Sequence, residues 1–212
     1  MKCNREQMRL YAVTDRSHLG EKSLYTAVEE ALQGGVTFLQ LREKTLSDEE
    51  ILAEARALLP LCRAHNVPLI INDNVDIALA TGADGVHVGQ EDLEAGTARQ
   101  KLGPDKILGV STHNVEEALR AEAQGADYLG VGAMFPTGTK KNVVPTSPET
   151  LRAICQAVSI PVVAIGGVSA ENLPQLAGCG IAGAAVVSAI FSQPNCQTAA
   201  RRLREILATN VK

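Results

Sequence analysis

The sequence has no tryptophan, and aromatic residues make up only 3% of its 212 residues. Proteins that bind single-stranded nucleic acid stack the bases on aromatic side chains, so this scarcity argues against that class. The chain also has no large excess of charge of one sign, because 20 basic and 24 acidic residues give a net charge of −4. No stretch of it is strongly basic. The sequence therefore gives no indication of a nucleic-acid or membrane-surface partner. With 45% apolar residues and few aromatics, the core must be aliphatic.

Long hydrophobic runs are missing as well. The longest weakly polar stretch, residues 178–191, is too short and too rich in glycine to span a bilayer. The N-terminal residues lack the apolar run of a signal peptide. The five cysteines lie far apart and form no C-x-x-C motif, which argues against a zinc knuckle or a thioredoxin-like site. We therefore expect reduced thiols and a cytoplasmic protein.

Short aliphatic runs alternate with longer amphipathic segments along the whole chain. Residues 47–65 have helical periodicity and begin with a capping box at Ser47, and Asn114 and Ser147 mark further helix starts. No linker or charge block divides the chain, so we expect one domain over residues 1–212. The aliphatic runs predict eight strands, at residues 9–15, 37–43, 68–73, 85–89, 106–112, 128–135, 161–168 and 183–190.

Small residues recur before every second predicted strand, beginning at Gly34, Gly82, Gly125 and Gly180. Glycine at a helix end permits the left-handed cap that returns the chain to the next strand. Eight parallel strands, each followed by a helix, predict an α/β fold of the single-domain (β/α)8 TIM-barrel type. A doubly wound open sheet is the main competitor, but no G-x-G-x-x-G follows the first strand.

Active sites of such barrels lie at the C-terminal ends of the strands. The second strand ends with Gln40, Arg42 and Lys44, which alternation places on one face, while Leu41 takes the other. If Leu41 packs against the helices, two cations and an amide point into the barrel mouth, where unpaired charge calls for an anion. The alternative is a solvated strand end in which Glu43 pairs locally.

Two carboxylates follow the neighbouring strands, Asp73 after the third and Asp92 after the fourth. They could form an ion-pair network with the cations. Magnesium, however, is typically bound through one or two carboxylates together with substrate phosphates. Asp73, Asp92 and the adjacent Asn72 amide therefore favour a magnesium–diphosphate site. His87 lies within an aliphatic strand, and we expect it to be packed and hydrogen-bonded rather than to act as a base.

Further strand ends offer groups suited to a second anion. Ser111 ends the fifth strand and is interpreted as a ligand contact. Residues 132–141 form a loop with hydroxyls and lysines that could close as a lid, although it is not a Walker A motif. Gly166 and Gly167 end the seventh strand, and a phosphate site built from the ends of strands seven and eight recurs in these barrels. A phosphosugar isomerase needs only one phosphate site. Two anion sites therefore favour an enzyme that joins two phosphorylated substrates.

The sequence resembles the thiamine-phosphate synthase family over essentially its whole length. The resemblance rests on six motifs in the family's order: YAVTD at 11–15, QLREK at 40–44, IND at 71–73, GVHVGQED at 85–92, FPTGTKK at 135–141 and AIGGV at 164–168. Gly138 occupies a variable place in the loop motif, which bears on loop flexibility more than on activity.

The resemblance implies the reaction and the roles of the residues. The family joins 4-amino-2-methyl-5-(diphosphooxymethyl)pyrimidine to 4-methyl-5-(2-phosphooxyethyl)thiazole and releases diphosphate. It implies catalytic roles for Arg42, Lys44 and Lys140 and Mg²⁺ ligands at Asp73 and Asp92. The implied pyrimidine diphosphate contacts are Gln40, Leu41, Arg42, Glu43, Lys44, Asn72, Ser111 and Lys140. The implied thiazole phosphate contacts are Thr137, Gly138, Thr139, Gly167, Val187 and Ser188.

In this chemistry the bond to diphosphate breaks to leave a pyrimidinylmethyl cation, which the thiazole nitrogen captures, so no protein nucleophile is needed. The nearest rival is a thiazole tautomerase paralogue, against which the complete set of diphosphate-binding residues argues. A phosphosugar isomerase of the same fold would need a carboxylate or histidine base close to its substrate. A non-catalytic binding protein would bind the product tightly without turnover. The oligomeric state stays open, a homo-oligomer included.

Overall fold

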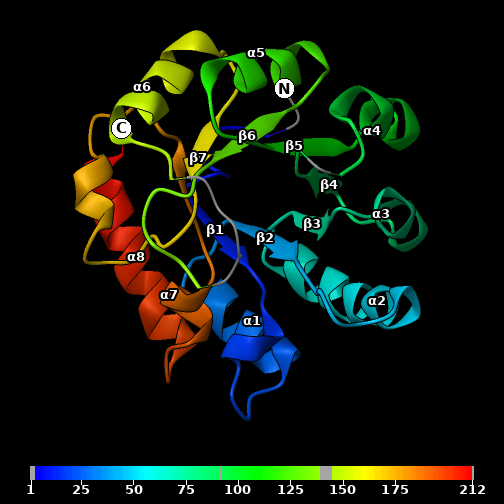
Figure 1. The fold of residues 1–212 in the computed structure, drawn as a ribbon. Helices are drawn as coiled ribbons and strands as arrows, with labels where there is room; N and C mark the ends of the chain where they lie inside the picture. The colour runs from blue at the N-terminus through cyan, green and yellow to red at the C-terminus, as the bar shows by residue number, and fades with distance from the viewer. Residues whose placement is uncertain (1–2, 91, 139–144, 212) are drawn as a thin grey trace.

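The computed structural model describes residues 3–90, 92–138 and 145–211 and contains a closed barrel of eight parallel strands. Each strand pairs with its successor in the chain, and β1 pairs with β8 to close the barrel (Figure 1). The strands are β1 (Leu10–Val13), β2 (Phe38–Leu41), β3 (Leu69–Asn72), β4 (Gly85–Val88), β5 (Ile107–Thr112), β6 (Tyr128–Val131), β7 (Val162–Ala164) and β8 (Gly183–Val186). The eight predicted strands are confirmed. Each is shorter than predicted, and all but β5 end earlier, because the last predicted residues lie beyond the strand at the barrel mouth and, after β8, in the helix that begins at Ser188.

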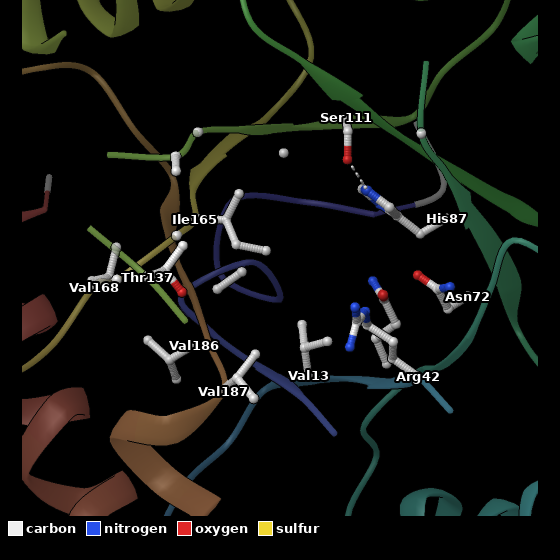
Figure 2. A pocket seen from close by; sticks show the side chains of 18 of the residues that line it. Val13, Arg42, Asn72, His87, Ser111, Thr137, Ile165, Val168, Val186 and Val187 are labelled. Atoms are coloured by element: carbon white, nitrogen blue, oxygen red, sulfur yellow. Dashed lines mark hydrogen bonds between the residues drawn. The ribbon is translucent and has the colours of Figure 1, made fainter. Parts of the chain in front are cut away.

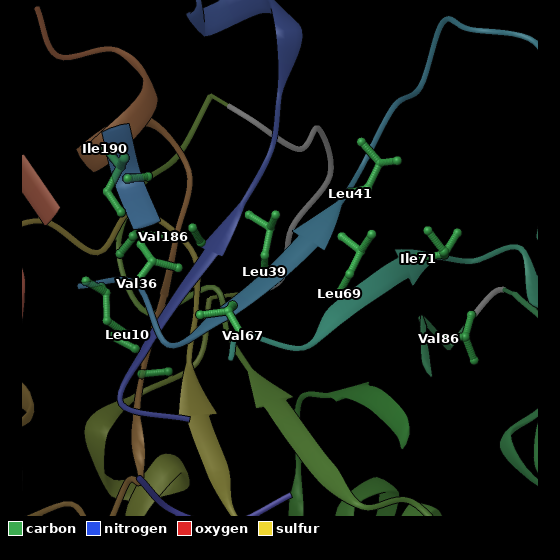
Figure 3. Close-up of a cluster of buried hydrophobic side chains, with 14 of the residues drawn as sticks. Leu10, Val36, Leu39, Leu41, Val67, Leu69, Ile71, Val86, Val186 and Ile190 are labelled. Atoms are coloured by element: carbon green, nitrogen blue, oxygen red, sulfur yellow. The ribbon is translucent and has the colours of Figure 1, made fainter. Parts of the chain in front are cut away.

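Alternation along the strands separates two hydrophobic clusters. In β1, Leu10 and Ala12 face the surrounding helices, whereas Tyr11 and Val13 belong to a smaller cluster inside the barrel. The outer cluster is aliphatic, as the composition predicts, and Figure 3 shows part of it along neighbouring strands. The three aromatic side chains inside the barrel meet edge to face, with ring centroids 4.8–5.8 Å apart; they are Tyr11, Phe38 and Tyr128.

Helices surround the barrel (Figure 1). They are α1 (Leu24–Gln33), α2 (Asp48–Ala64), α3 (Val75–Thr81), α4 (Ala95–Leu102), α5 (Val115–Ala123), α6 (Pro148–Ala157), α7 (Ser188–Phe191) and α8 (Cys196–Asn210), with short 3-10 helices η1 (Arg16–His18) and η2 (Leu173–Leu176). The predicted helix starts are confirmed. Ser47 caps α2 with the full capping box, and Asn114 and Ser147 accept backbone hydrogen bonds at the starts of α5 and α6.

The connection from β7 to β8 departs from the predicted pattern of one helix after each strand. It contains only the four-residue η2, and the short α7 follows β8 before α8 begins. Pro174 lies in η2, and Gly178 and Gly180 follow it with φ angles of +75° and +90°. These residues favour turns over a continued helix. The connection therefore stays short before the chain enters β8.

The repeat of small residues has the predicted conformational role with one difference: Gly34 ends α1 in the right-handed region at φ −77°, and its neighbour Gly35 takes the positive φ of +99°. Gly82 caps α3 in the left-handed region at φ +71°, and Gly125 lies at φ +91° between α5 and β6. A side chain would be strained at either position. The repeat thus marks the points where the chain turns from a helix into β4 and β6.

Candidate active site

A cavity of about 500 Å³ opens at the C-terminal ends of the strands. Its volume lies within the range of small-molecule sites, roughly 300–1,000 Å³. Figure 2 shows that its lining differs from one side to the other, with Arg42 and Asn72 opposite Thr137 and Val168. We call the part with Arg42, Lys44, Asp73 and Asp92 the charged side, and the part with Gly166, Gly167, Val187 and Ser188 the glycine side.

The alternation predicted for the end of β2 is confirmed. Gln40, Arg42 and Lys44 all line the cavity. The intervening Leu41 is buried in the cluster that packs against the helices. Glu43 also points away from the lining residues, and its side chain is only 2% exposed beside Arg16, with 3.4 Å between Oε2 and Nε. Burial raises the pKa of Glu43, although the charge of Arg16 acts in the opposite direction.

Contacts with the loop that follows β1 hold Arg42 in place. Its Nη1 lies 3.3 Å from Asp15 Oδ2, and its backbone N–H donates to Thr14 Oγ1 at 2.9 Å. Burial alone would raise the pKa of Asp15, but hydrogen bonds from Ser17 and the charge of Arg42 hold it below its usual value. Asp15 contacts only Nη1 of the guanidinium, and among the described residues no side-chain partner takes the other N–H groups of Arg42, which lines the cavity where an anion could bind.

Asp73 and Asp92 come from neighbouring loops and form a carboxylate pair. Asp73 Oδ2 accepts hydrogen bonds from Lys44 Nζ at 2.7 Å and from Asn72 Nδ2 at 2.6 Å. Asp92 Oδ2 accepts one from the backbone of Gly89 at 2.7 Å. Burial raises the pKa of Asp92 and the neighbouring Asp73 raises it further, against the effect of the Gly89 N–H.

This carboxylate pair fits a hydrated divalent cation. A positive ion between the two groups would relieve the repulsion that raises the pKa of Asp92. Within residues 3–90, 92–138 and 145–211, no cluster of three or more His, Cys, Asp or Glu residues could form an all-protein cage. A pair of carboxylates matches the way Mg²⁺ is bound when phosphates and waters complete its shell.

His87 and Ser111 lie between the two sides. The ring of His87 is within hydrogen-bond distance of Tyr128 Oη at Nδ1 and of Ser111 Oγ at Nε2, both at 2.9 Å. Figure 2 shows the second of these bonds. The expectation of a packed, hydrogen-bonded histidine is therefore confirmed. Sequence reasoning missed Tyr128 and its partner Tyr11, and the available signal was that both occupy inward-facing strand positions.

On the glycine side, the main chain after β7 lies close to the main chain of the loop after β6. Gly166 and Gly167 have φ angles of +90° and +64°. A Cβ on Gly167 would lie 2.4 Å from the carbonyl oxygen of Pro136, and one on Gly166 would lie 2.6 Å from Ala133 Cα. Asn172 fixes the turn by donating to the Gly167 carbonyl at 2.8 Å. Glycine is therefore required here by both conformation and space.

The remaining predicted contacts fall in three groups. Thr137, Gly167, Val187 and Ser188 line the glycine side, and Asn72 and Ser111 line the cavity elsewhere. Gly138 is exposed and is not among the lining residues in the described part of the chain. Thr139 and Lys140 lie outside the described residues, as does all of the predicted lid beyond Gly138.

Comparisons with known proteins agree with this architecture. The family model for thiamine monophosphate synthase matches residues 10–190. A thiamine-phosphate synthase from Ruminiclostridium cellulolyticum is 54% identical over 197 residues, covering 93% of this chain and 94% of that protein. One from Methanobrevibacter smithii is 48% identical, covering 98% and 99%. The structure of thiamine phosphate pyrophosphorylase from Pyrococcus furiosus matches with a TM-score of 0.89 and 38% identity, covering 98% and 99%. The chain belongs to the thiamine monophosphate synthase family.

Thiamine monophosphate synthases are transferases of thiamine biosynthesis, and this chain is an enzyme of that class. The tautomerase alternative is not favoured by these relatives. A 3-hexulose-6-phosphate synthase matches with a TM-score of 0.62 but only 20% identity, so it shares the fold alone. No helix in the described part of the chain has the length and apolar character that a membrane crossing requires.

Proposed function

We propose that this enzyme joins 4-amino-2-methyl-5-(diphosphooxymethyl)pyrimidine to 4-methyl-5-(2-phosphooxyethyl)thiazole, giving thiamine phosphate and diphosphate. The observation that carries the proposal is the division of one cavity into a charged side and a glycine side. Two differently built anion-binding regions suit two phosphorylated substrates that must meet between them. The names of the relatives, thiamine-phosphate synthase and thiamine phosphate pyrophosphorylase, support the same product.

The charged side binds the diphosphate of the pyrimidine substrate. Arg42 and Lys44 line this side, and Asn72 adds an amide. Asp73 and Asp92 would hold Mg²⁺, which when bound supplies positive charge to the oxygens of the leaving diphosphate. Arg42 is already oriented by Asp15, so little rearrangement is needed as negative charge develops. Lys140, by resemblance to the family, is a third cation for the same group.

The glycine side binds the single phosphate of the thiazole. Gly167 allows the phosphate to approach the main chain, and Val187 and Ser188 follow β8 at the neighbouring edge of the cavity. The ends of strands seven and eight are a recurrent phosphate-binding place in this fold. Thr137, which lies on the same side in Figure 2, supplies a hydroxyl near the phosphate.

No protein base or nucleophile is required by this reaction. When the C–O bond to diphosphate breaks, its electron pair leaves with the diphosphate and the methylene carbon becomes a cation stabilised by the aminopyrimidine. The thiazole nitrogen then forms the new C–N bond with its own lone pair. The residues of this chain therefore act by binding, aligning the two rings and stabilising the leaving group.

A turnover assay with both phosphorylated substrates tests the proposal. Thiamine phosphate is oxidised to fluorescent thiochrome, and diphosphate release is measured in parallel, with and without Mg²⁺. We expect equal amounts of the two products and a rate that depends on Mg²⁺. Folded protein that binds the thiazole phosphate but forms no thiamine phosphate would overturn the proposal.

A further inference from the structure

A chain of four hydrogen bonds runs below the cavity and joins Gln40 to Ser111. Gln40 Nε2 donates to Tyr11 Oη at 2.6 Å, and Tyr11 Oη lies 2.7 Å from Tyr128 Oη. Tyr128 Oη lies 2.9 Å from His87 Nδ1, and His87 Nε2 lies 2.9 Å from Ser111 Oγ. The two ends line the cavity, whereas both tyrosines are 1% exposed or less. The chain crosses the barrel through β2, β1, β6, β4 and β5.

The orientation of the Gln40 amide sets the direction of this chain. An amide nitrogen only donates, so Tyr11 Oη accepts from Gln40 and directs its own single proton to Tyr128. Tyr128 has then accepted one bond, and its proton goes to His87 Nδ1. If Tyr128 donated to Tyr11 instead, the buried Tyr11 proton would have no acceptor among the partners that the described residues give it. An unpaired buried donor is costly, so the first direction is favoured.

The direction determines what the other end offers to a ligand. With Nδ1 accepting from Tyr128, neutral His87 carries its proton on Nε2 and donates it to Ser111 Oγ. The hydroxyl proton of Ser111 is then left for an acceptor in the cavity. At the opposite end, the Gln40 amide keeps its Oε1 as an acceptor. Reversing the Gln40 amide would reverse every bond and exchange these roles.

We propose that Tyr11, Tyr128 and His87 are positioning residues that couple the orientation of the Gln40 amide to the donor role of Ser111. The cavity then recognises a ligand with an N–H donor toward Gln40 Oε1 and an acceptor toward Ser111. An amino-substituted heteroaromatic ring has both kinds of group. This inference rests on the proposed function for the identity of the ring, but the polarity of the chain can be measured without substrate.

Nitrogen-15 NMR of histidine-labelled protein reports the tautomer of His87 directly, with the H87Q variant used for assignment. We expect the tautomer protonated on Nε2 in the wild-type enzyme. The sharpest test is Gln40→Glu, because a carboxylate only accepts, so Tyr11 must donate to it and every bond of the chain reverses. We expect this variant to carry the His87 proton on Nδ1. Tyr11→Phe should instead keep it on Nε2, because among the described residues the Tyr128 proton then has His87 Nδ1 as its acceptor. Tyr25→Phe is the matched control, because Tyr25 is 43% exposed and outside the chain.

Kinetics separates positioning from a general loss of structure. Loss of one net hydrogen bond at the Gln40 end should raise KM for the pyrimidine diphosphate about fivefold to tenfold in Tyr11→Phe. KM for the thiazole phosphate should stay unchanged, and Tyr25→Phe should behave as wild type. Protonation on Nδ1 in the wild-type enzyme would overturn the proposal, as would an unaltered His87 tautomer in Gln40→Glu. If the wild-type enzyme forms no thiamine phosphate, the proposed function fails, while the tautomer result still tests the chain.

Discussion

The charged side and the glycine side of the cavity differ in what makes each of them suitable for an anion. On the charged side the polar groups are long side chains, which need partners of their own, such as Asp15 for Arg42 and Asp73 for Lys44. On the glycine side the important feature is the absence of a side chain, because Gly167 lies where a Cβ would meet the Pro136 carbonyl. One side is therefore sensitive to the loss of charge and the other to the gain of a methyl group.

Arg42→Ala should have the largest effect on turnover. Removing one preorganised electrostatic contact to the leaving group should lower kcat by roughly 10²–10³. The thiochrome assay at saturating concentrations of both substrates measures this loss. Arg56→Ala, at an exposed position on α2, is the control. Nearly full turnover in Arg42→Ala would remove Arg42 from the proposed leaving-group site.

Asp92→Asn should change the requirement for the metal. The variant loses a charged ligand oxygen. The Mg²⁺ concentration that gives half the maximal rate should therefore rise by about 10- to 100-fold or more, the size typical of changes around metal ligands. Titration of Mg²⁺ against initial rate measures the shift. Asp105→Asn changes the same side chain at an exposed loop position. An unchanged Mg²⁺ dependence in Asp92→Asn would exclude this carboxylate as a ligand.

Gly167→Ala should raise KM for the thiazole phosphate about tenfold or more, because the turn must move away from Pro136 and a shift of about 1 Å at a site can cost up to roughly 10²-fold. Gly178→Ala is a close control, since its φ of +75° is similar but nothing lies within 4 Å of the added Cβ. It should cost only about 1–2 kcal/mol of stability from the left-handed conformation.

Thermal unfolding and steady-state kinetics of the two glycine variants separate the backbone strain that both share from the steric clash with Pro136 that only Gly167→Ala introduces. The melting temperature of Gly178→Ala should fall by about 2–8 °C with kinetics unchanged. Equal KM values for the thiazole phosphate in the two variants would argue against close approach of the ligand to Gly167.

Glu43→Gln should have the smallest effect, and it concerns stability below the charged side. Burial raises the pKa of Glu43, so the folded protein binds this proton more tightly than the unfolded chain. The associated stability is present below the unfolded-state pKa of about 4.3 and is lost as pH rises toward the folded-state value. The stability of Glu43→Gln relative to wild type should therefore increase between pH 4 and pH 7.

Urea unfolding of both proteins across this pH range measures the change. Glu21→Gln, at an exposed position, should show no such trend. A difference between Glu43→Gln and wild type that shrinks as pH rises would reverse the inferred direction of the pKa shift.

The parts of the fold and site that follow from local patterns could be predicted from the sequence. Alternation in β2 predicted that Gln40, Arg42 and Lys44 share a face, and parallel strands predicted that Asp73 and Asp92 reach one rim. Ser47 predicted the start of α2 for the same reason, since a capping box spans only four residues.

The missed features depend on contacts between distant segments. Tyr11 and Tyr128 are 117 residues apart and meet only when the barrel closes. The burial of Glu43 beside Arg16 likewise depends on how the loop after β1 packs against β2. The α-helix predicted between β7 and β8 is replaced by a short 3-10 helix that contains Pro174. The repeating strand–helix pattern predicts a helix at this place, and that pattern does not show where local residues such as proline interrupt it.

Calorimetric titration of two ligands into two variants tests the division of the cavity most directly. The ligands are inorganic diphosphate with Mg²⁺ and the thiazole phosphate, and the proteins are wild type, Arg42→Ala and Gly167→Ala. We predict that Arg42→Ala weakens diphosphate binding and spares the thiazole phosphate, whereas Gly167→Ala does the opposite. If each variant weakens both ligands equally, or the two ligands compete for one site in the wild-type enzyme, the two-sided account is contradicted.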